Sequence, residues 1–185
     1  MDATELCFTP ANELADLIRA REVSPVELID AVLARIESLE PRLNAFAHLT
    51  ADAARAAARE AEAAVVRGDA LGPLHGLPVT IKDLTLTAGV PNERGSHSQV
   101  GVVPEVDAPF VARLKRAGAI PLGKTTTSEF GWKGVSESPL TGITHNPWKH
   151  GFNAGASSAG ASVAAAAGYG PLHQGSDGAG SVRMP

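Results

Sequence analysis

The sequence predicts an α/β fold in which helices cover a largely buried sheet. Two observations lead to this prediction: apolar residues repeat at helical spacing before about residue 70, and short apolar runs alternate with helices after it. The chain has 185 residues, of which 44% are hydrophobic and 19% charged. A chain of this length and composition can bury a core of its own, so we expect a globular protein.

The first 70 residues are predicted to form a helical segment. Ser24 followed by Pro25 is a typical helix start, with serine as the N-cap and proline at the first helical position. The apolar repeat that follows continues to Pro41, where we expect this helix to end. A second helix, rich in Ala, Glu and Arg, is expected over residues 51–66, with Gly68 as its end.

From residue 71 onwards, strands and helices are predicted to alternate. The last of these helices begins with serines, so its N-terminus would face a polar group. The expected elements are a strand at 77–81, a loop at 89–104, a helix at 108–117, a strand at 119–122 and a helix at 157–167.

Net charge, cysteine content and the length of apolar runs limit which partners and which cellular compartment we expect. The net charge of -4 gives no basic footprint for nucleic acid, and we expect Lys115, Arg116 and Lys124 to be solvated. Cys7 is the one cysteine, so an intramolecular disulfide is impossible; it lies near a terminus expected to be mobile. The N-terminus lacks a signal-peptide pattern and no apolar run is long enough for a bilayer. We therefore expect a cytoplasmic protein without a membrane partner.

Residues Gly118–Thr125 match the G-x-x-x-x-G-K-[ST] pattern of a phosphate-binding loop. That loop needs a strand before it and a helix after it, whereas here a helix is predicted before Gly118 and the interior is apolar. We treat the match as coincidental. A nucleotide-binding protein remains the alternative from another functional class.

The six histidines show no metal-binding spacing. None lies four residues from another on a clear helix with a carboxylate, so no metal site is predicted. His75 or His173 could act as a general base for a serine, although surface or structural roles are more common for histidine.

Lys82 directly follows the predicted strand at 77–81. A buried lysine without a partner charge has a lowered pKa and can act as a base near neutral pH. An ion pair with Asp83 or another carboxylate is the alternative. The sequence around Lys82 does not decide between the two.

Two serine clusters, around Ser157 and Ser181, lie within runs of Gly and Ala. Small residues let backbone N–H groups approach a ligand, and hydroxyls can project from the tight turns they form. These are the parts of an activated serine and an oxyanion hole. Each cluster alone could be a simple turn or helix cap, but both together with a lysine after a strand are more specific.

These features together resemble the amidase signature enzymes, serine hydrolases with a Ser–cis-Ser–Lys triad. The resemblance covers nearly the whole chain and also accounts for the apparent phosphate loop. It rests on Gly76-Leu-Pro-Val-Thr-Ile-Lys82-Asp83, Thr87-Ala-Gly89, Gly123-Lys124-Thr125, Glu129-Phe130, Asn146-Pro147-Trp148 and the two serine clusters.

The resemblance implies a role for each matching residue. Lys82 would be the triad lysine, Ser157 the serine with a cis peptide bond, and Ser181 the nucleophile. The oxyanion hole would be lined by the amides of Gly178, Ala179, Gly180 and Ser181. Ser158, Asp177 and Arg183 would support the site.

The resemblance also implies a fold and an activity. The fold would have a mixed sheet core, with an N-terminal helical segment at 1–70 and the N-terminal part of the α/β core at 71–185, in one domain. The activity would be amide hydrolysis through a Ser181 acyl-enzyme, with Ser157 and Lys82 as proton relay and no metal or cofactor. The substrate would be a small-molecule amide, and the N-terminal helices could form a homodimer contact.

Two alternatives follow from the same resemblance. The chain could be an A-type amidotransferase subunit that produces ammonia from glutamine together with partner chains. Because family members generally continue well beyond this length, we expect a truncated chain, and an inactive fragment is the other alternative.

The chain departs from the family pattern at four positions. Ala156, Ala159 and Ala179 stand where the family usually has glycine, and Thr126 replaces a common asparagine. The Cβ of Ala179 excludes some conformations with positive φ, so we expect it to narrow the oxyanion site.

Overall fold

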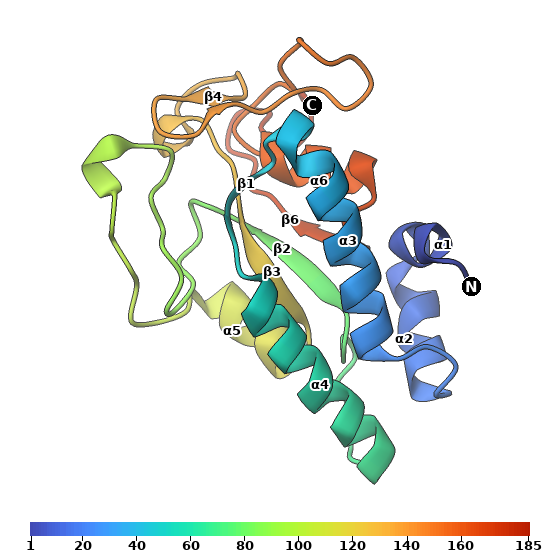
Figure 1. The fold of residues 1–185 in the computed structure, drawn as a ribbon. Coiled ribbons are helices and arrows are strands. Elements are labelled where there is room, and N and C mark those ends of the chain that lie inside the picture. Colours follow the sequence, from blue (N-terminus) through green and yellow to red (C-terminus); the bar gives the residue numbers. More distant parts are fainter.

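A four-stranded sheet lies at the centre of the computed structural model, which describes residues 1–185 (Figure 1). Its strand order is β1-β3-β2-β6. Strand β2 is parallel to β3 and to β6, whereas β1 is antiparallel to β3. The mixed sheet of an α/β fold is thus confirmed. The strands are β1 Phe46–Leu49, β2 Pro78–Lys82, β3 Ile120–Thr125 and β6 Leu172–Gln174.

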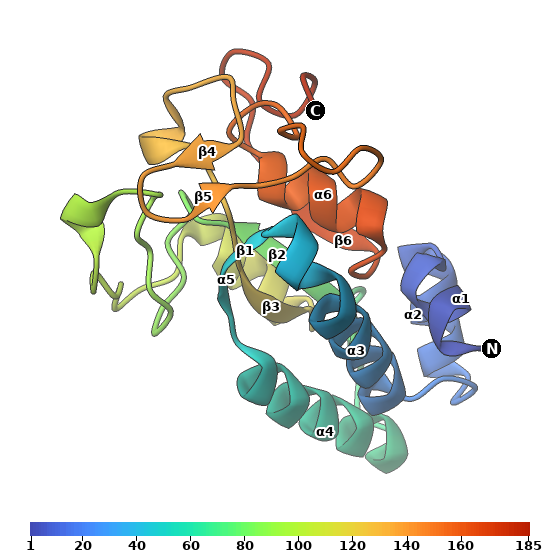
Figure 2. The same cartoon turned by 45° about the horizontal axis from the view of Figure 1, so that its top comes forward.

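Helices cover both faces of this sheet (Figure 2). Val111 of α5 packs against Val79 and Ile81 of β2, whereas the larger core cluster lies on the other face with α3, α4 and α6. The helices are α1 Ala3–Phe8, α2 Ala11–Arg19, α3 Pro25–Leu43, α4 Ala51–Arg67, α5 Pro109–Arg116 and α6 Ala159–Ala167. A small hairpin is formed by β4 Glu137–Ser138 and β5 Gly142–Ile143. None of these helices is long and apolar enough to cross a membrane.

The predicted helix starts and ends are largely confirmed. The Ser24 hydroxyl accepts hydrogen bonds from two amides of the first turn of α3, and Pro25 is its first residue. Helix α4 ends at Gly68, whose φ of 78° closes the helix in the left-handed conformation. The end at Pro41 is wrong by two residues, because α3 continues to Leu43 and Asn44 supplies the left-handed cap.

The N-terminal segment also holds structure that the apolar pattern did not reveal. Strand β1 pairs with β3, with Phe46 opposite Thr125. Four residues are too few for strand periodicity to show. The mobile terminus expected around Cys7 is wrong, since Cys7 is buried in α1. A reciprocal pair of hydrogen bonds between Asp2 and Glu5 fixes the start of that helix.

The segment Gly118–Thr125 does not form a phosphate-binding loop. Residues Ile120–Thr125 are strand β3, and its main chain is hydrogen-bonded to β1 on one side and β2 on the other. The amides needed to cradle a phosphate are therefore part of the sheet.

Helix α6 approaches β3 through Gly160. A Cβ at this position would lie 2.4 Å from the Ala45 carbonyl oxygen and 2.5 Å from the Thr126 amide nitrogen. Both atoms belong to the backbone, so neither can move aside easily. The close approach brings the start of α6 to the end of the sheet where Lys82 lies.

Gly160→Ala should therefore destabilise the protein by about 1–3 kcal/mol, the usual range for overpacking. Helix propensity alone would predict the opposite sign, a gain of about 0.5–1 kcal/mol. Urea unfolding measures the difference. Gly178→Ala is the control, because nothing lies within 4 Å of a Cβ there. An increase in stability for Gly160→Ala would contradict the packing described here.

Candidate active site

Lys82 is the last residue of β2, and its side chain is fully buried. Its Nζ lies within hydrogen-bond distance of four hydroxyls, 2.9 Å from those of Ser157 and Ser158 and 3.1 Å from those of Ser176 and Ser181. The alternative of an ion pair with Asp83 is wrong, because Asp83 pairs with Lys124 instead. The buried lysine thus has only hydroxyls at its amino group.

The serines also bond to one another. The Ser181 hydroxyl lies 2.7 Å from the Ser157 hydroxyl and 2.7 Å from that of Ser158. Ser157 and Ser158 immediately precede α6, so the positive end of the helix dipole faces the cluster. The structure therefore brings together Lys82, Ser157 and Ser181, and places Ser158 beside Ser181 as closely as Ser157.

The pKa of Lys82 reflects this burial. Loss of solvent lowers it from 10.5 to about 8, while the charge of Asp177 raises it. A lysine with such a pKa can exchange a proton near neutral pH, which a solvated lysine does not do.

Asp177 organises the turn that carries Ser181. Its carboxylate accepts hydrogen bonds from the amides of Gly180 at 2.7 Å and Val182 at 3.0 Å, and pairs with Arg183 at 2.9 Å. The hydrogen bond from Arg183 and those from the two amides hold the pKa of Asp177 well below its usual value. Asp177 and Arg183 thus shape the loop without touching the serine hydroxyls.

The amides around Ser181 are not equivalent. The Gly180 N–H is occupied by Asp177, whereas the N–H groups of Gly178, Ala179 and Ser181 donate no hydrogen bond within the protein. Three of the four amides expected in the oxyanion hole are therefore free. Ala179 does not adopt a positive φ, so its Cβ causes no backbone strain here.

The cis peptide bond expected at Ser157 is wrong. The structure contains no cis peptide bond. For a residue other than proline the trans form is more stable by about 3–4 kcal/mol. With a trans bond, the Ser157 hydroxyl already reaches both Lys82 and Ser181.

The serine cluster opens into a cavity of about 410 Å³. Ser157, Ser176 and Ser181 line this cavity. The other lining residues are Leu84, Gly131, Trp132, Lys133, Gly134, Ala156, Gly178, Ala179 and Met184. A small molecule in this cavity would meet the free amides and the Ser181 hydroxyl together.

Three polar residues near the site were not identified from the sequence. Ser176 contacts Lys82 as described above, and Gln174 accepts the Lys82 main-chain N–H at 3.0 Å. Lys124, expected to be solvated, is fully buried. Lys124 ends an apolar run just as Lys82 does, and this position was the signal for its burial.

The two candidate histidine bases have other partners. His75 contacts the Ala61 carbonyl oxygen at 2.9 Å. His173 lies between the Thr80 hydroxyl and the Gly170 carbonyl oxygen, and burial lowers its pKa to about 4. Neither histidine contacts a serine of the cluster, so a histidine base is wrong for this site.

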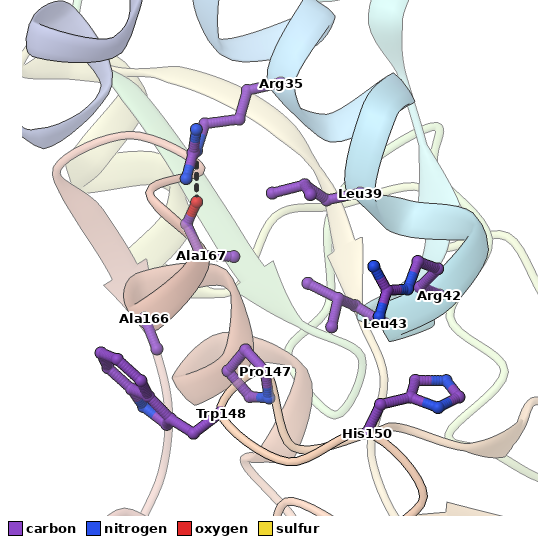
Figure 3. Close-up of a pocket in the computed structure, with 9 residues that line it drawn as sticks. All are labelled: Arg35, Leu39, Arg42, Leu43, Pro147, Trp148, His150, Ala166 and Ala167. Atoms are coloured by element: carbon purple, nitrogen blue, oxygen red, sulfur yellow. Dashed lines mark hydrogen bonds between the residues drawn. The ribbon is translucent and has the colours of Figure 1, made fainter.

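A second cavity, of about 250 Å³, lies between α3 and α6 (Figure 3). The Arg35 guanidinium donates to the Ala167 carbonyl oxygen across it (Figure 3). None of the site residues expected from the sequence lines this cavity. The serine cluster and its own cavity are therefore the candidate active site.

Sequence comparison shows what this chain is similar to. A family model described as Amidase matches residues 27–185. An acylamidase of Rhodococcus erythropolis is 43% identical over 185 residues, which are 100% of this chain and 39% of that protein. The A-type component of a glutamyl-tRNA(Gln) amidotransferase from Chloroflexus aggregans is 42% identical over 182 residues, 98% of this chain and 37% of that protein. The chain thus spans about two fifths of the length of these relatives.

Solved structures show the same similarity. A bacterial aryl acylamidase of the amidase signature family superposes with a TM-score of 0.90 and 30% identity, over 95% of this chain and 37% of that chain. A 6-aminohexanoate cyclic dimer hydrolase complexed with substrate gives a TM-score of 0.85 and 34% identity, over 95% and 35% of the two chains.

The burial of Lys82 has a measurable effect on stability. Its folded-state pKa of about 8 lies below its unfolded value of 10.5, so between these values the unfolded state binds more protons. The free energy of unfolding should therefore rise with pH in this window. Relative to Lys82→Met, the wild type should gain about 2 kcal/mol between about pH 7 and 9.5 in urea unfolding. Exposed Lys133, replaced by Met, is the control; equal pH dependence of all three proteins would contradict the buried site.

Proposed function

The chain belongs to the amidase signature family, and from its site we propose that it carries the catalytic residues of an amidase. The enzyme hydrolyses a carboxamide to a carboxylate and ammonia or an amine. The observation that supports this most is the Ser181 hydroxyl, which lies within hydrogen-bond distance of Ser157 and Lys82 at the edge of an open cavity.

In the first step Ser181 Oγ attacks the amide carbonyl carbon. Its proton passes to Ser157, whose own proton passes to neutral Lys82. The carbonyl oxygen becomes an oxyanion that accepts hydrogen bonds from the free amides of the 178–181 loop. Each such donor contributes about 10²–10³ in rate.

In the second step the tetrahedral intermediate loses its amine. Lys82 returns a proton through Ser157 to the leaving nitrogen, and the C–N bond breaks. Water then attacks the acyl-enzyme with the same relay acting as base, so that Ser181 regains its proton and the carboxylate leaves. Ser158, as close to Ser181 as Ser157, holds the nucleophile in place.

The cavity indicates the kind of amide that fits. Leu84, Trp132 and Met184 supply apolar surface close to the free amides. We propose a small amide with an apolar acyl group; the acylamidase relative supports an amide as the substrate class. A cytoplasmic location and a homodimer remain predictions.

The amidotransferase relative supports a second candidate function. In that case the same acyl-enzyme chemistry would release ammonia from glutamine, and partner chains would receive it. Glutaminase activity that appears only with copurified partners would favour this candidate over a free amidase.

Ser181→Ala should abolish acyl-enzyme formation and lower kcat/KM by about 10³-fold or more. Intact-mass spectrometry with an activated ester or amide detects the acyl-enzyme. Ser162→Ala is the matched control, since the Ser162 hydroxyl bonds only the Ser158 carbonyl oxygen within its own helix. Unchanged turnover in the Ser181 variant would exclude Ser181 as nucleophile.

The rate should also depend on pH in a defined direction. The relay needs neutral Lys82, so kcat/KM for a substrate without ionisable groups should rise with pH and level off above about 8. A profile that is flat from about pH 6 to 10 would contradict Lys82 as the base.

A further inference from the structure

A second buried lysine lies directly behind the active site and has no part in the proton relay. Lys124 on β3 pairs with Asp83 at 3.2 Å, and their side chains are 0% and 1% exposed. An ion pair without solvent is costly to form, so its presence requires further compensation.

Hydrogen bonds complete that compensation. Besides Lys124, the Asp83 carboxylate accepts the Arg94 amide at 2.7 Å, the Glu93 amide at 3.2 Å and the Asn92 side-chain amide at 3.2 Å. Lys124 Nζ also donates to the Thr85 carbonyl oxygen at 2.8 Å. The pair is therefore held rigidly from several sides.

The Asp83–Lys124 ion pair and the serine cluster lie on opposite faces of the sheet. Lys124 lies opposite Ile81 in the parallel ladder, and Thr125 lies opposite Lys82. Because side chains alternate along a strand, Lys124 shares the face of Ile81 and not that of Lys82. Asp83 follows Lys82 directly in the chain, and its side chain lies with that of Lys124 on the face opposite the Lys82 side chain.

Few other charges lie around Lys82. The C-terminal loop contributes Asp177, which is paired with Arg183, and β6 contributes His173, which is neutral at ordinary pH. Helix α6 has no titratable side chain. On the side of the ion pair, the loop after β2 contributes Arg94, whose charge acts on Lys124, and Glu93, which is paired with His48.

We propose that Lys124 is a positioning residue for the reaction: it holds and neutralises Asp83, so that Lys82 beside it can give up its proton. This rests on the proposed amidase function, in which Lys82 must become neutral. Without Lys124, the Asp83 carboxylate would stabilise the protonated form of Lys82. Without Asp83, the charge of Lys124 would do the reverse.

The direction of the change in the Lys82 pKa distinguishes this role from a merely structural one. Lys124→Gln should raise the Lys82 pKa, Asp83→Asn should lower it, and the double variant should return it close to wild type. A structural role would instead loosen the site in every variant and admit water. All three pKa values would then move upwards, towards that of a solvated lysine.

The test is an NMR titration of the full-length natural chain with 13C-labelled lysine, in which Lys82 is assigned by its absence in Lys82→Met. Shifts of opposite sign in the two single variants support the proposal. Shifts of the same sign, or none, overturn it. If a single variant fails to fold, the double variant and Lys124→Arg, which keeps the charge, must both retain the wild-type Lys82 pKa; a shift in either overturns the proposal.

The NMR readout does not depend on turnover. If the wild type has no amidase activity but the Lys82 pKa still shifts in the variants as described, the proposed function is rejected. The electrostatic role of Lys124 is then retained. In an active enzyme the rising limb of the pH–rate profile should move with the Lys82 pKa. Each unit of change in that pKa should alter kcat/KM at low pH by about tenfold.

Discussion

The burial of a lysine among hydroxyls is the constraint on which this structure depends. Lys82 loses its solvent shell at the end of β2, and four serine hydroxyls replace it. Those hydroxyls come from the start of α6 and from the C-terminal loop, so both segments must meet at the end of the sheet. Desolvation of a charged amine is unfavourable, which is why the pKa of Lys82 falls to about 8.

The sheet separates the Lys82 site on one face from the Asp83–Lys124 ion pair on the other. On the face of Lys82 the only neighbouring carboxylate is Asp177, which is turned towards the Ser181 loop and Arg183. On the opposite face, Asp83 and Lys124 cancel each other. Gly160 makes this geometry possible because it lets α6 approach the backbone of Ala45 and Thr126, which flank β1 and β3, more closely than any side chain would permit.

Much of this could be predicted from local sequence signals. Ser24, Gly68 and the position of Lys82 after an apolar run each specify a local conformation that the structure confirms. The long-range contacts could not be predicted in this way. Ser176 and Gln174 join the site only because β6 pairs with β2.

Four serines surround one lysine, and in the proposed mechanism only one of them is the nucleophile. Reaction with a fluorophosphonate, followed by peptide mapping with mass spectrometry, tests this directly, since the serine oxygen replaces fluoride on phosphorus and keeps the label. We expect the label on Ser181, which lines the cavity together with the free amides. A label on Ser157, Ser158 or Ser176 with Ser181 unmodified would contradict it.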